Sequence, residues 1–351
     1  MMQVSNCWIN HSRKNNILNS LKHDMIMDNV FRACPPGLFE GEDNLLILGN
    51  GFDLDLGFPT SYKHFFESSY WPFVRGSEDY GELGLFLLNN LRRRDLWFNL
   101  EDALAEYGLS RATPKPMKRD ENWQKNDDER DFNRLVTGLG DYLRSLDFTS
   151  LDDKSTAAKV LGAFSQVPNP GKIYTFNYTN VEQYQRSLEI TQIQPHYIHG
   201  DLESKNIILG VGDYVKNLPP ATDFMYKTNR DGYRSTELFK DLASFKTIII
   251  FGLSMSKIDY PYFEDFFHDI ISGKYEGDQR KYVRIVTDDE DSRRQILRNL
   301  REMNDGMIKL RNYADFDIIR TKDNIDEIKV LSMLKTINPE WKIDTTSDDE
   351  I

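Results

Sequence analysis

Short apolar runs alternate with longer amphipathic segments along the chain from residue 44 onward. Strand-sized runs occupy residues 44–49, 172–176, 196–199, 206–209, 246–251 and 281–286. Helical patterns follow several of them, notably at 260–271 and 290–303, and the aromatic-rich stretch 61–73 also has a helical pattern. Strands that are continuously apolar and separated by helices are typical of a parallel sheet covered on both faces. The pattern therefore predicts an α/β, Rossmann-like fold with a mostly parallel sheet.

A helical block interrupts this alternation after the first strand and helix. Apolar residues recur at three- and four-residue intervals from Phe132 to Leu146, which predicts a helix with one apolar face. The charged stretch 111–130 before it is predicted to be a solvated insertion or loop. The chain then divides into four parts: an N-terminal extension (1–43), an α/β core in two segments (44–74 and 151–340), a helical insertion (75–150) and an acidic tail (341–351).

Composition narrows the class of protein. Of the 351 residues, 44 are Lys or Arg and 56 are Asp or Glu, so the net charge of −12 disfavours nonspecific nucleic-acid or anionic-membrane binding. No apolar run approaches the roughly 20 residues of a membrane span, and the first residues lack the features of a signal peptide, so we expect a cytoplasmic protein. The two cysteines, Cys7 and Cys34, exclude a disulfide framework and a four-cysteine zinc site.

Small and polar residues follow four of the predicted strands, where an open α/β sheet places its ligand site. The first set directly follows the first strand and comprises Gly49, Asn50, Gly51, Phe52 and Asp53. Its glycines allow a close approach of backbone amides to a pyrophosphate, or they serve only to reverse the chain. The third glycine of a dinucleotide fingerprint is missing, because Leu54 stands there.

Two further sets follow the next strands. Asn177, two residues after Thr175, can hold a ribose hydroxyl or a water through its amide, or it can cap the next helix. His199 precedes a glycine and is a candidate general base that Asp201 could orient, although a single histidine can also be structural. Both alternatives stay open on these residues alone.

The fourth set leaves its strand at Gly252 and continues through Ser254 to Asp259. Small residues there leave room for a ribose or an adenine, Ser254 can hydrogen bond to it, and Asp259 either faces that pocket or caps the next helix. A weaker fifth set at 209–213 contains glycines that can simply turn a loop. The shared placement of the four stronger sets at strand ends favours one ligand site.

The same residues carry a resemblance to a known family. Residues 47–62 resemble the opening signature of the bacteriophage abortive infection AbiH family. TFNYTN at 175–180, YIHGD at 197–201, ILGVGD at 208–213 and IFGLSMSKID at 250–259 match its later motifs in order, so that the resemblance spans roughly residues 44–320. The order of motifs is also similar to that of the wider SIR2-like group, in which the fold binds NAD and defence members cleave it.

The resemblance implies roles for individual residues. Asn177 would lie beside the nicotinamide ribose and position the ribose or a water, and His199 would be the catalytic histidine. The NAD-binding residues would be Gly49, Asn50, Gly51, Phe52, Asp53, Thr175, Gly252, Ser254 and Asp259. No metal is expected in the site.

Two departures from the SIR2-like pattern bear on the chemistry. The acid that commonly follows the asparagine motif is replaced by Thr179, with Glu182 the nearest carboxylate in sequence. The zinc-binding cysteines of protein deacetylases are absent, so lysine deacylation is disfavoured.

The sequence thus predicts an antiphage abortive-infection protein that binds NAD and hydrolyses its nicotinamide–ribose bond. The alternative is a noncatalytic sensor or interaction module that binds NAD or ADP-ribose, which Thr179 and the missing glycine favour. An enzyme acting on nucleic acid is disfavoured by the net charge, and the arginines at 92–94 are interpreted as a solvated helix face. The expected partners are NAD or a related dinucleotide, a phage-derived trigger and further copies of the chain, without a membrane or nonspecific nucleic acid.

Overall fold

The computed structural model describes residues 44–74, 76, 79–90, 99–111, 121–230, 233, 237–304 and 309–342, without the side chains of 121–126. Both cysteines, the N-terminal extension, the arginines at 92–94 and most of the acidic tail lie outside the described residues. No helix within these described ranges is long and apolar enough to cross a membrane.

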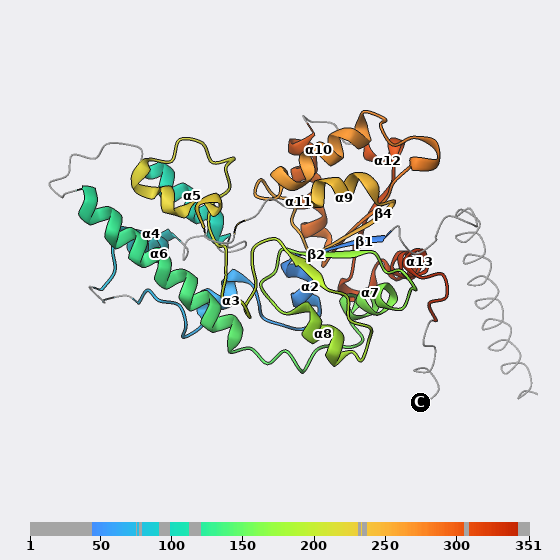
Figure 1. Cartoon of the computed structure of the whole chain (residues 1–351), viewed down its shortest axis with the longest axis horizontal. Helices are drawn as coiled ribbons and strands as arrows, with labels where there is room; N and C mark the ends of the chain where they lie inside the picture. The colour runs from blue at the N-terminus through green and yellow to red at the C-terminus, as the bar shows by residue number, and fades with distance from the viewer. Residues whose placement is uncertain are drawn as a thin grey trace, which may run out of the picture.

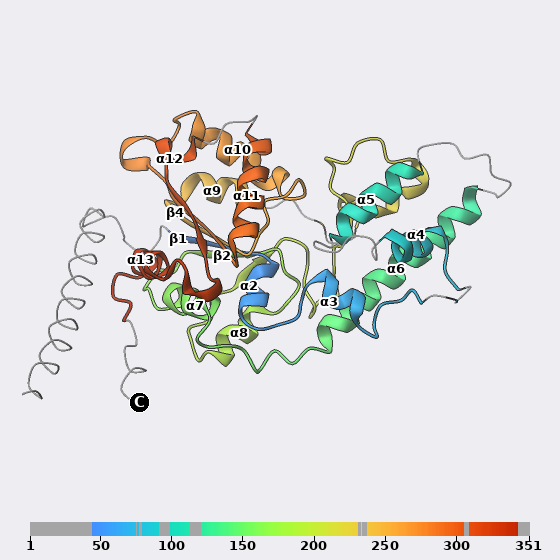
Figure 2. The same cartoon turned by 180° about the vertical axis from the view of Figure 1, so that it is seen from behind.

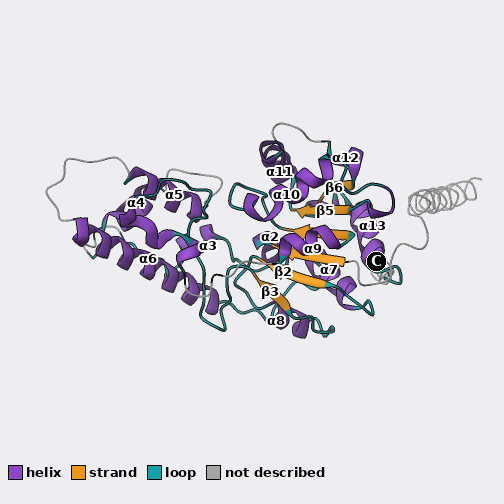
Figure 3. Ribbon diagram, turned by 45° about the horizontal axis from the view of Figure 1, so that its top comes forward, coloured by secondary structure: helices purple, strands orange, loops and turns teal. Residues whose placement is uncertain are grey.

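A six-stranded parallel sheet forms the centre of the molecule. Its strands are β1 (Asn44–Leu48), β2 (Lys172–Thr175), β3 (Pro195–Tyr197), β4 (Thr247–Phe251), β5 (Tyr282–Thr287) and β6 (Asp315–Arg320). They lie in the order β3-β2-β1-β4-β5-β6, and every neighbouring pair is parallel (Figure 3). The prediction of a Rossmann-like α/β fold is confirmed. The strand order reverses between β1 and β4, and doubly wound sheets bind ligands beyond the carboxyl ends of the strands at such a switch point.

Helices cover both faces of the sheet because alternate residues of each buried strand point to opposite sides. Leu46 and Leu48 of β1 belong to one apolar cluster, and Leu45 and Ile47 belong to the other. The first face carries α2 (Asn50–Asp55), α7 (Thr156–Ser165), α8 (Val181–Ser187) and α13 (Glu327–Ile337). The second carries α9 (Leu238–Ser244), α10 (Tyr260–Ile271), α11 (Glu290–Met303) and α12 (Leu310–Tyr313), as Figure 1 shows.

A helical block stands beside the sheet (Figures 1 and 2). It consists of α4 (Glu82–Asn90), α5 (Leu100–Ser110) and α6 (Glu121–Arg144), together with the short helices η2 (Pro220–Met225) and η3 (Lys227–Asn229). Phe224 of η2 packs on Phe132 of α6 with ring centroids 5.6 Å apart. The connection from β3 to β4 therefore joins the helices that are inserted after the first βα unit.

Several predicted elements have different bounds in the structure. The helix expected around 132–146 begins at Glu121, so part of the charged stretch 111–130 is helical. The helix expected over 61–73 is only α3 (Tyr62–Glu67), because Ser68 ends it and Pro72 follows in place of a helical donor. Helices α10 and α11 have the expected bounds.

The prediction of a strand at 206–209 is wrong, and β6 was not predicted. The apolar residues at 207–209 are buried outside the sheet, and the amide of Ile208 donates to the carbonyl of His199 at 2.8 Å. The apolar run thus reflects tertiary packing, which a buried strand resembles in sequence. β6 instead lies at the edge of the sheet, where two aspartates and an arginine interrupt its apolar pattern.

Candidate functional site

Three of the four predicted residue sets meet where the strand order reverses. The Gly49 amide donates to the Phe251 carbonyl at 2.8 Å, which continues the pairing of β1 with β4. On the other side of β1, the Phe176 amide donates to the Leu48 carbonyl, also at 2.8 Å. The loops after β1, β2 and β4 therefore begin side by side, as expected from the parallel sheet.

The glycines of this edge allow two backbones to touch. The Gly51 amide donates to the Gly252 carbonyl at 3.0 Å. Gly252 has φ +75°, and a Cβ atom there would lie 2.3 Å from the Phe52 nitrogen. A Cβ on Gly51 would lie 2.6 Å from the Gly252 Cα. Glycine is thus required for the close approach of the two loops, while phosphate binding by this turn stays a prediction.

Asn177 is held in one orientation at this edge. Its Nδ2 donates to the Gly49 carbonyl and to Oδ1 of Asp53, both at 3.0 Å. Because a carbonyl only accepts, the contact with Gly49 fixes which end of the amide is the nitrogen. Its Oδ1 is the remaining acceptor and has no protein partner in the described part of the chain. The helix-capping alternative belongs to Asn180, whose Oδ1 accepts from the Gln183 amide at 2.9 Å.

Asp53 supplies a carboxyl group next to the asparagine motif. It lies 1% exposed, and its Oδ2 accepts from the hydroxyl of Thr179 at 2.8 Å. Burial raises the pKa of Asp53 to about 7, against the opposing effect of the bonds from Thr179 and Asn177. A carboxyl group from α2 thus lies against Thr179. Glu182, the nearest carboxylate in sequence, instead contacts Gln194 and Tyr197.

His199 follows β3 and is 6% exposed. Its Nε2 lies 3.2 Å from Nζ of Lys227 and 3.4 Å from the hydroxyl of Tyr262. The ring meets Phe176 edge-on, with centroids 5.4 Å apart, and it also hydrogen bonds to the Phe176 backbone. Burial, reinforced by the positive charge of Lys227, holds the pKa of His199 well below its usual range. The imidazole is therefore neutral at pH 7, as proton acceptance requires.

The prediction that Asp201 orients His199 is wrong. Asp201 accepts from the amide and the hydroxyl of Ser204, at 2.7 and 2.8 Å, within its own loop. Lys227 and Phe176 hold the imidazole instead. Phe176 also precedes Asn177 in the chain, so it links the histidine to the asparagine motif.

A buried ion pair beside His199 was not found from the sequence. Lys227 of η3 lies 2.9 and 3.0 Å from the two carboxylate oxygens of Glu101 on α5. The two side chains are 4% and 5% exposed. Their positions are 126 apart in the chain, and no local spacing connects them. In the sequence, Lys227 is connected with the site only in that it follows the weaker fifth set at 209–213. In the structure, its amide donates to the carbonyl of Val211 in that set.

Asp259 faces back into the loop after β4. Its Oδ2 accepts from the Ser256 amide at 2.9 Å, and it makes no side-chain bond to α10, although it occupies the N-cap position. Burial raises the pKa of Asp259 to about 7. Ser254 is exposed, and its backbone carbonyl accepts from Asn299 at 2.8 Å. Of the two alternatives for Asp259, the structure therefore excludes side-chain capping.

The other residues predicted to bind NAD have structural partners. Phe52 is fully buried and packs edge-on against Phe251 at 5.3 Å. The hydroxyl of Thr175 accepts from the Asn177 amide at 3.1 Å. Oδ1 of Asn50 accepts from the Thr60 hydroxyl at 2.7 Å. These contacts shape the walls of the site around Asn177 and Asp53.

The comparison with known families agrees with this arrangement. The family model described as bacteriophage abortive infection AbiH matches residues 45–275, which is about two thirds of the chain. The chain belongs to the AbiH family. The matched range contains every strand-end set and both members of the Glu101–Lys227 pair. Membership of this family supports a role in phage abortive infection. A comparison with curated proteins finds no match.

Proposed function

We propose that this AbiH-family protein acts in abortive infection by binding NAD at the switch point and hydrolysing its nicotinamide–ribose bond. The observation that carries the proposal is the fixed amide of Asn177, whose Oδ1 remains free to accept beside the buried carboxyl group of Asp53. It stands at the carboxyl ends of strands in the Rossmann order. Contacts of the glycine turn with the pyrophosphate rest on the resemblance to SIR2-like proteins.

Hydrolysis needs a positioned water and stabilisation of a positively charged ribose. The bond from the nicotinamide nitrogen to ribose C1′ breaks, the electron pair stays with nicotinamide, and water oxygen bonds to C1′ and loses a proton. In the proposed arrangement Asn177 Oδ1 accepts from the water or a ribose hydroxyl. The proton goes to Nε2 of the neutral His199, whose lone pair faces Lys227 at 3.2 Å in this structure, so the transfer replaces that hydrogen bond. Correct positioning and proton acceptance are each sufficient to accelerate such a step by orders of magnitude.

The test is release of nicotinamide from NAD by the purified protein, measured by chromatography with and without phage lysate as a source of trigger. Asn177→Ala and His199→Ala are each expected to lower release by at least about 100-fold. Asn180→Ala is the matched control, since it removes the helix cap three residues away; it costs about 1 kcal/mol of stability and keeps turnover. Turnover that persists in both site variants contradicts the assignment.

In cells, the same variants distinguish an enzyme from a noncatalytic sensor. Induced expression of the wild type is expected to lower NAD during infection, and Asn177→Ala is expected to leave NAD unchanged while the protein level stays equal. Growth arrest without a fall in NAD contradicts NAD hydrolysis as the route to abortive infection.

A noncatalytic sensor of NAD or ADP-ribose is the second candidate. It is favoured by the position of Lys227, because Nε2 of His199 already faces this ammonium group at 3.2 Å. Calorimetry distinguishes the two candidates. A sensor binds NAD stably and releases no nicotinamide, whereas an enzyme consumes the titrant.

A further inference from the structure

Three elements that are distant in the chain meet around His199. Lys227 comes from the connection between β3 and β4, Glu101 from α5 of the helical block, and His199 from the loop after β3. The Lys227 ammonium group lies 2.9 and 3.0 Å from the two oxygens of Glu101 and 3.2 Å from Nε2 of His199. The ammonium group thus has one partner for each of its three hydrogens.

The donors in this cluster determine the state of the imidazole. An ammonium group can only donate, so Nε2 of His199 must present its lone pair to Lys227. A neutral imidazole carries one ring proton, which must then lie on Nδ1, and the Phe176 backbone is a further hydrogen-bond partner of the ring. The cluster is compatible with one tautomer and disfavours the imidazolium, which would direct a second N–H at the ammonium group.

The stability of the fold does not by itself require an ion pair beside His199. Desolvation of both ions opposes the burial of an ion pair, and apolar residues of similar volume commonly stabilise such a position equally well. Here one carboxylate compensates the ammonium group and leaves its third hydrogen directed at the candidate proton acceptor. The Glu101 carboxyl group also accepts from the Gly210 amide, which ties α5 to the predicted fifth residue set.

We propose that Glu101 and Lys227 are positioning residues that hold His199 as a neutral imidazole with Nε2 as its acceptor, and that α5 of the helical block is thereby part of the site. The inference rests on the proposed function for the use of His199 in proton transfer. The state of the imidazole itself is independent of any activity.

The other ionisable groups around His199 are identified by their contacts. Tyr262 of α10 faces Nε2 at 3.4 Å and hydrogen bonds in turn to Tyr233. The carboxyl group of Asp259 interacts electrostatically with both Lys227 and Glu101. The Tyr262 hydroxyl stays neutral, because burial raises its pKa well above its usual value. Lys227 is therefore the charge that directly faces the imidazole.

The wild-type protein alone can test this inference. Nitrogen NMR of protein labelled at histidine, with the His199 signals assigned by comparison with His199→Ala, reports the tautomer and the titration. We expect the Nδ1–H tautomer at pH 7 and protonation of His199 only well below the usual pH range of histidine. An Nε2–H tautomer or an imidazolium at pH 7 overturns the inference.

Variants test the role of the pair. The double substitution Glu101→Gln with Lys227→Met removes both charges together and avoids leaving an unpaired buried ion. It is expected to raise the pKa of His199 by about one unit or more, since the facing positive charge is lost. Lys227→Arg is expected to retain the low pKa. Lys172→Met is the matched control, because Lys172 pairs with Asp241 at 2.8 Å at the amino end of β2.

The activity readout separates positioning from mere stability. In the double variant, the acid limb of the pH profile for nicotinamide release is expected to move upward with the NMR titration. A uniform loss of rate with an unmoved limb and an unchanged His199 titration overturns the inference. If the wild type releases no nicotinamide while the NMR results are as expected, the proposed NAD hydrolysis fails and the positioning of His199 stands.

Discussion

At the scale of single residues, the candidate site contains a carboxyl group that titrates near neutral pH. Burial raises the pKa of Asp53 to about 7, above its value in the unfolded chain. The stability that this group contributes is therefore complete below about pH 4 and is lost as the pH rises through 7, by up to about 4 kcal/mol. Asp53→Asn removes this dependence and keeps an acceptor for Asn177.

Chemical denaturation at pH 5 and pH 8 measures the effect. We expect the wild type to lose more stability than Asp53→Asn between the two values, so that the variant gains relative stability at pH 8. If the difference in stability between the wild type and Asp53→Asn is the same at pH 5 and at pH 8, the carboxyl group does not titrate in this range.

A second residue-scale prediction concerns the contact between the loops after β1 and β4. Gly252→Ala places a Cβ 2.3 Å from the Phe52 nitrogen in a residue with φ +75°, so it combines backbone strain with an atomic overlap. Gly57→Ala is the matched control, because Gly57 has φ +95° and nothing within 4 Å of a Cβ. We expect about 1 kcal/mol of destabilisation for the control and about 3 kcal/mol or more for Gly252→Ala. Equal losses in thermal unfolding would contradict a close contact.

The candidate site shows how far residue-level prediction reaches. Asn177 and His199 were predicted as site residues because strand ends in a parallel sheet must share an edge, which is a rule of topology. The contact of Asp53 with Thr179 bridges 126 positions, and so does that of Glu101 with Lys227. Neither pair has a period or a spacing that a single sequence reveals. Asp201 was assigned to His199 by proximity in the chain, and the loop turned it toward Ser204 instead.

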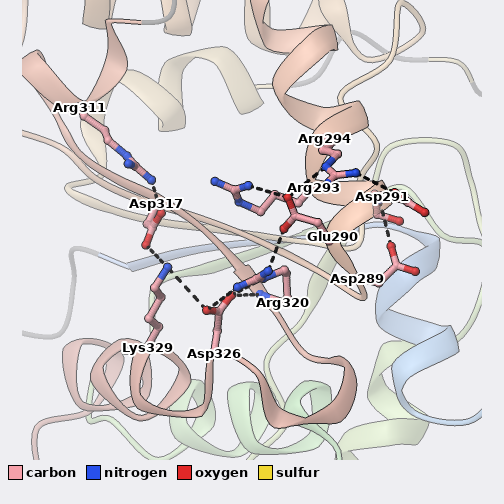
Figure 4. A network of polar contacts seen from close by, with 11 residues as sticks. Asp289, Glu290, Asp291, Arg293, Arg294, Arg311, Asp317, Arg320, Asp326 and Lys329 are labelled. Carbon is pink, nitrogen blue, oxygen red and sulfur yellow. Dashed lines mark hydrogen bonds and ion pairs between the residues drawn. The ribbon is translucent and has the colours of Figure 1, made fainter.

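At the scale of elements, a polar network attaches the edge strand β6 to its neighbours (Figure 4). Arg320, at the end of β6, donates to both oxygens of Asp326, before α13, and to Glu290 of α11. The bond from Arg320 holds the pKa of Asp326 at about 2. Because this value lies below that of the unfolded chain, the stabilisation is present above about pH 4 and is lost as the pH falls toward 2.

Asp326→Asn tests this attachment. At pH 7 we expect a loss on the order of 1 kcal/mol, measured by urea denaturation, that shrinks as the pH is lowered to 3. Asp141→Asn is the control, since its ion pair with Arg144 at 2.8 Å is exposed, and it should change stability by less than about 0.5 kcal/mol. Equal effects of the two substitutions would contradict a specific role of the network.

The same strand explains the limits of element prediction. The strands β1, β4 and β5 were predicted because their residues are almost all buried and mostly apolar, and only half-buried Arg284 interrupts the apolar run of β5. β6 has the burial pattern of an edge strand, with exposed or half-buried Asp315, Asp317 and Arg320 between apolar residues. Residues 207–209 show the opposite case, because their apolar run has the sequence pattern of a buried strand although the residues lie outside the sheet.

At the scale of the whole molecule, the helical block and the sheet share one apolar cluster. This cluster includes Leu46 and Phe164 of the α/β core as well as Phe132 and Leu135 of α6. The contact of Lys227 with His199, which follows β3, and the loop at 207–211 reinforce the same contact. Such continuity favours cooperative unfolding of the block and the sheet, although each has its own secondary structure.

Phe132→Ala tests this cooperativity. Phe132 is fully buried, so its truncation is expected to cost about 3–4 kcal/mol. Hydrogen exchange followed by mass spectrometry should then show a parallel loss of protection in peptides from α6 and from β1 and β4. Phe239→Ala is the control, because Phe239 is 59% exposed, and it should leave both regions protected. Loss of protection confined to α4, α5 and α6 would mean that the block unfolds independently, and Glu101 could then leave the site without unfolding the sheet.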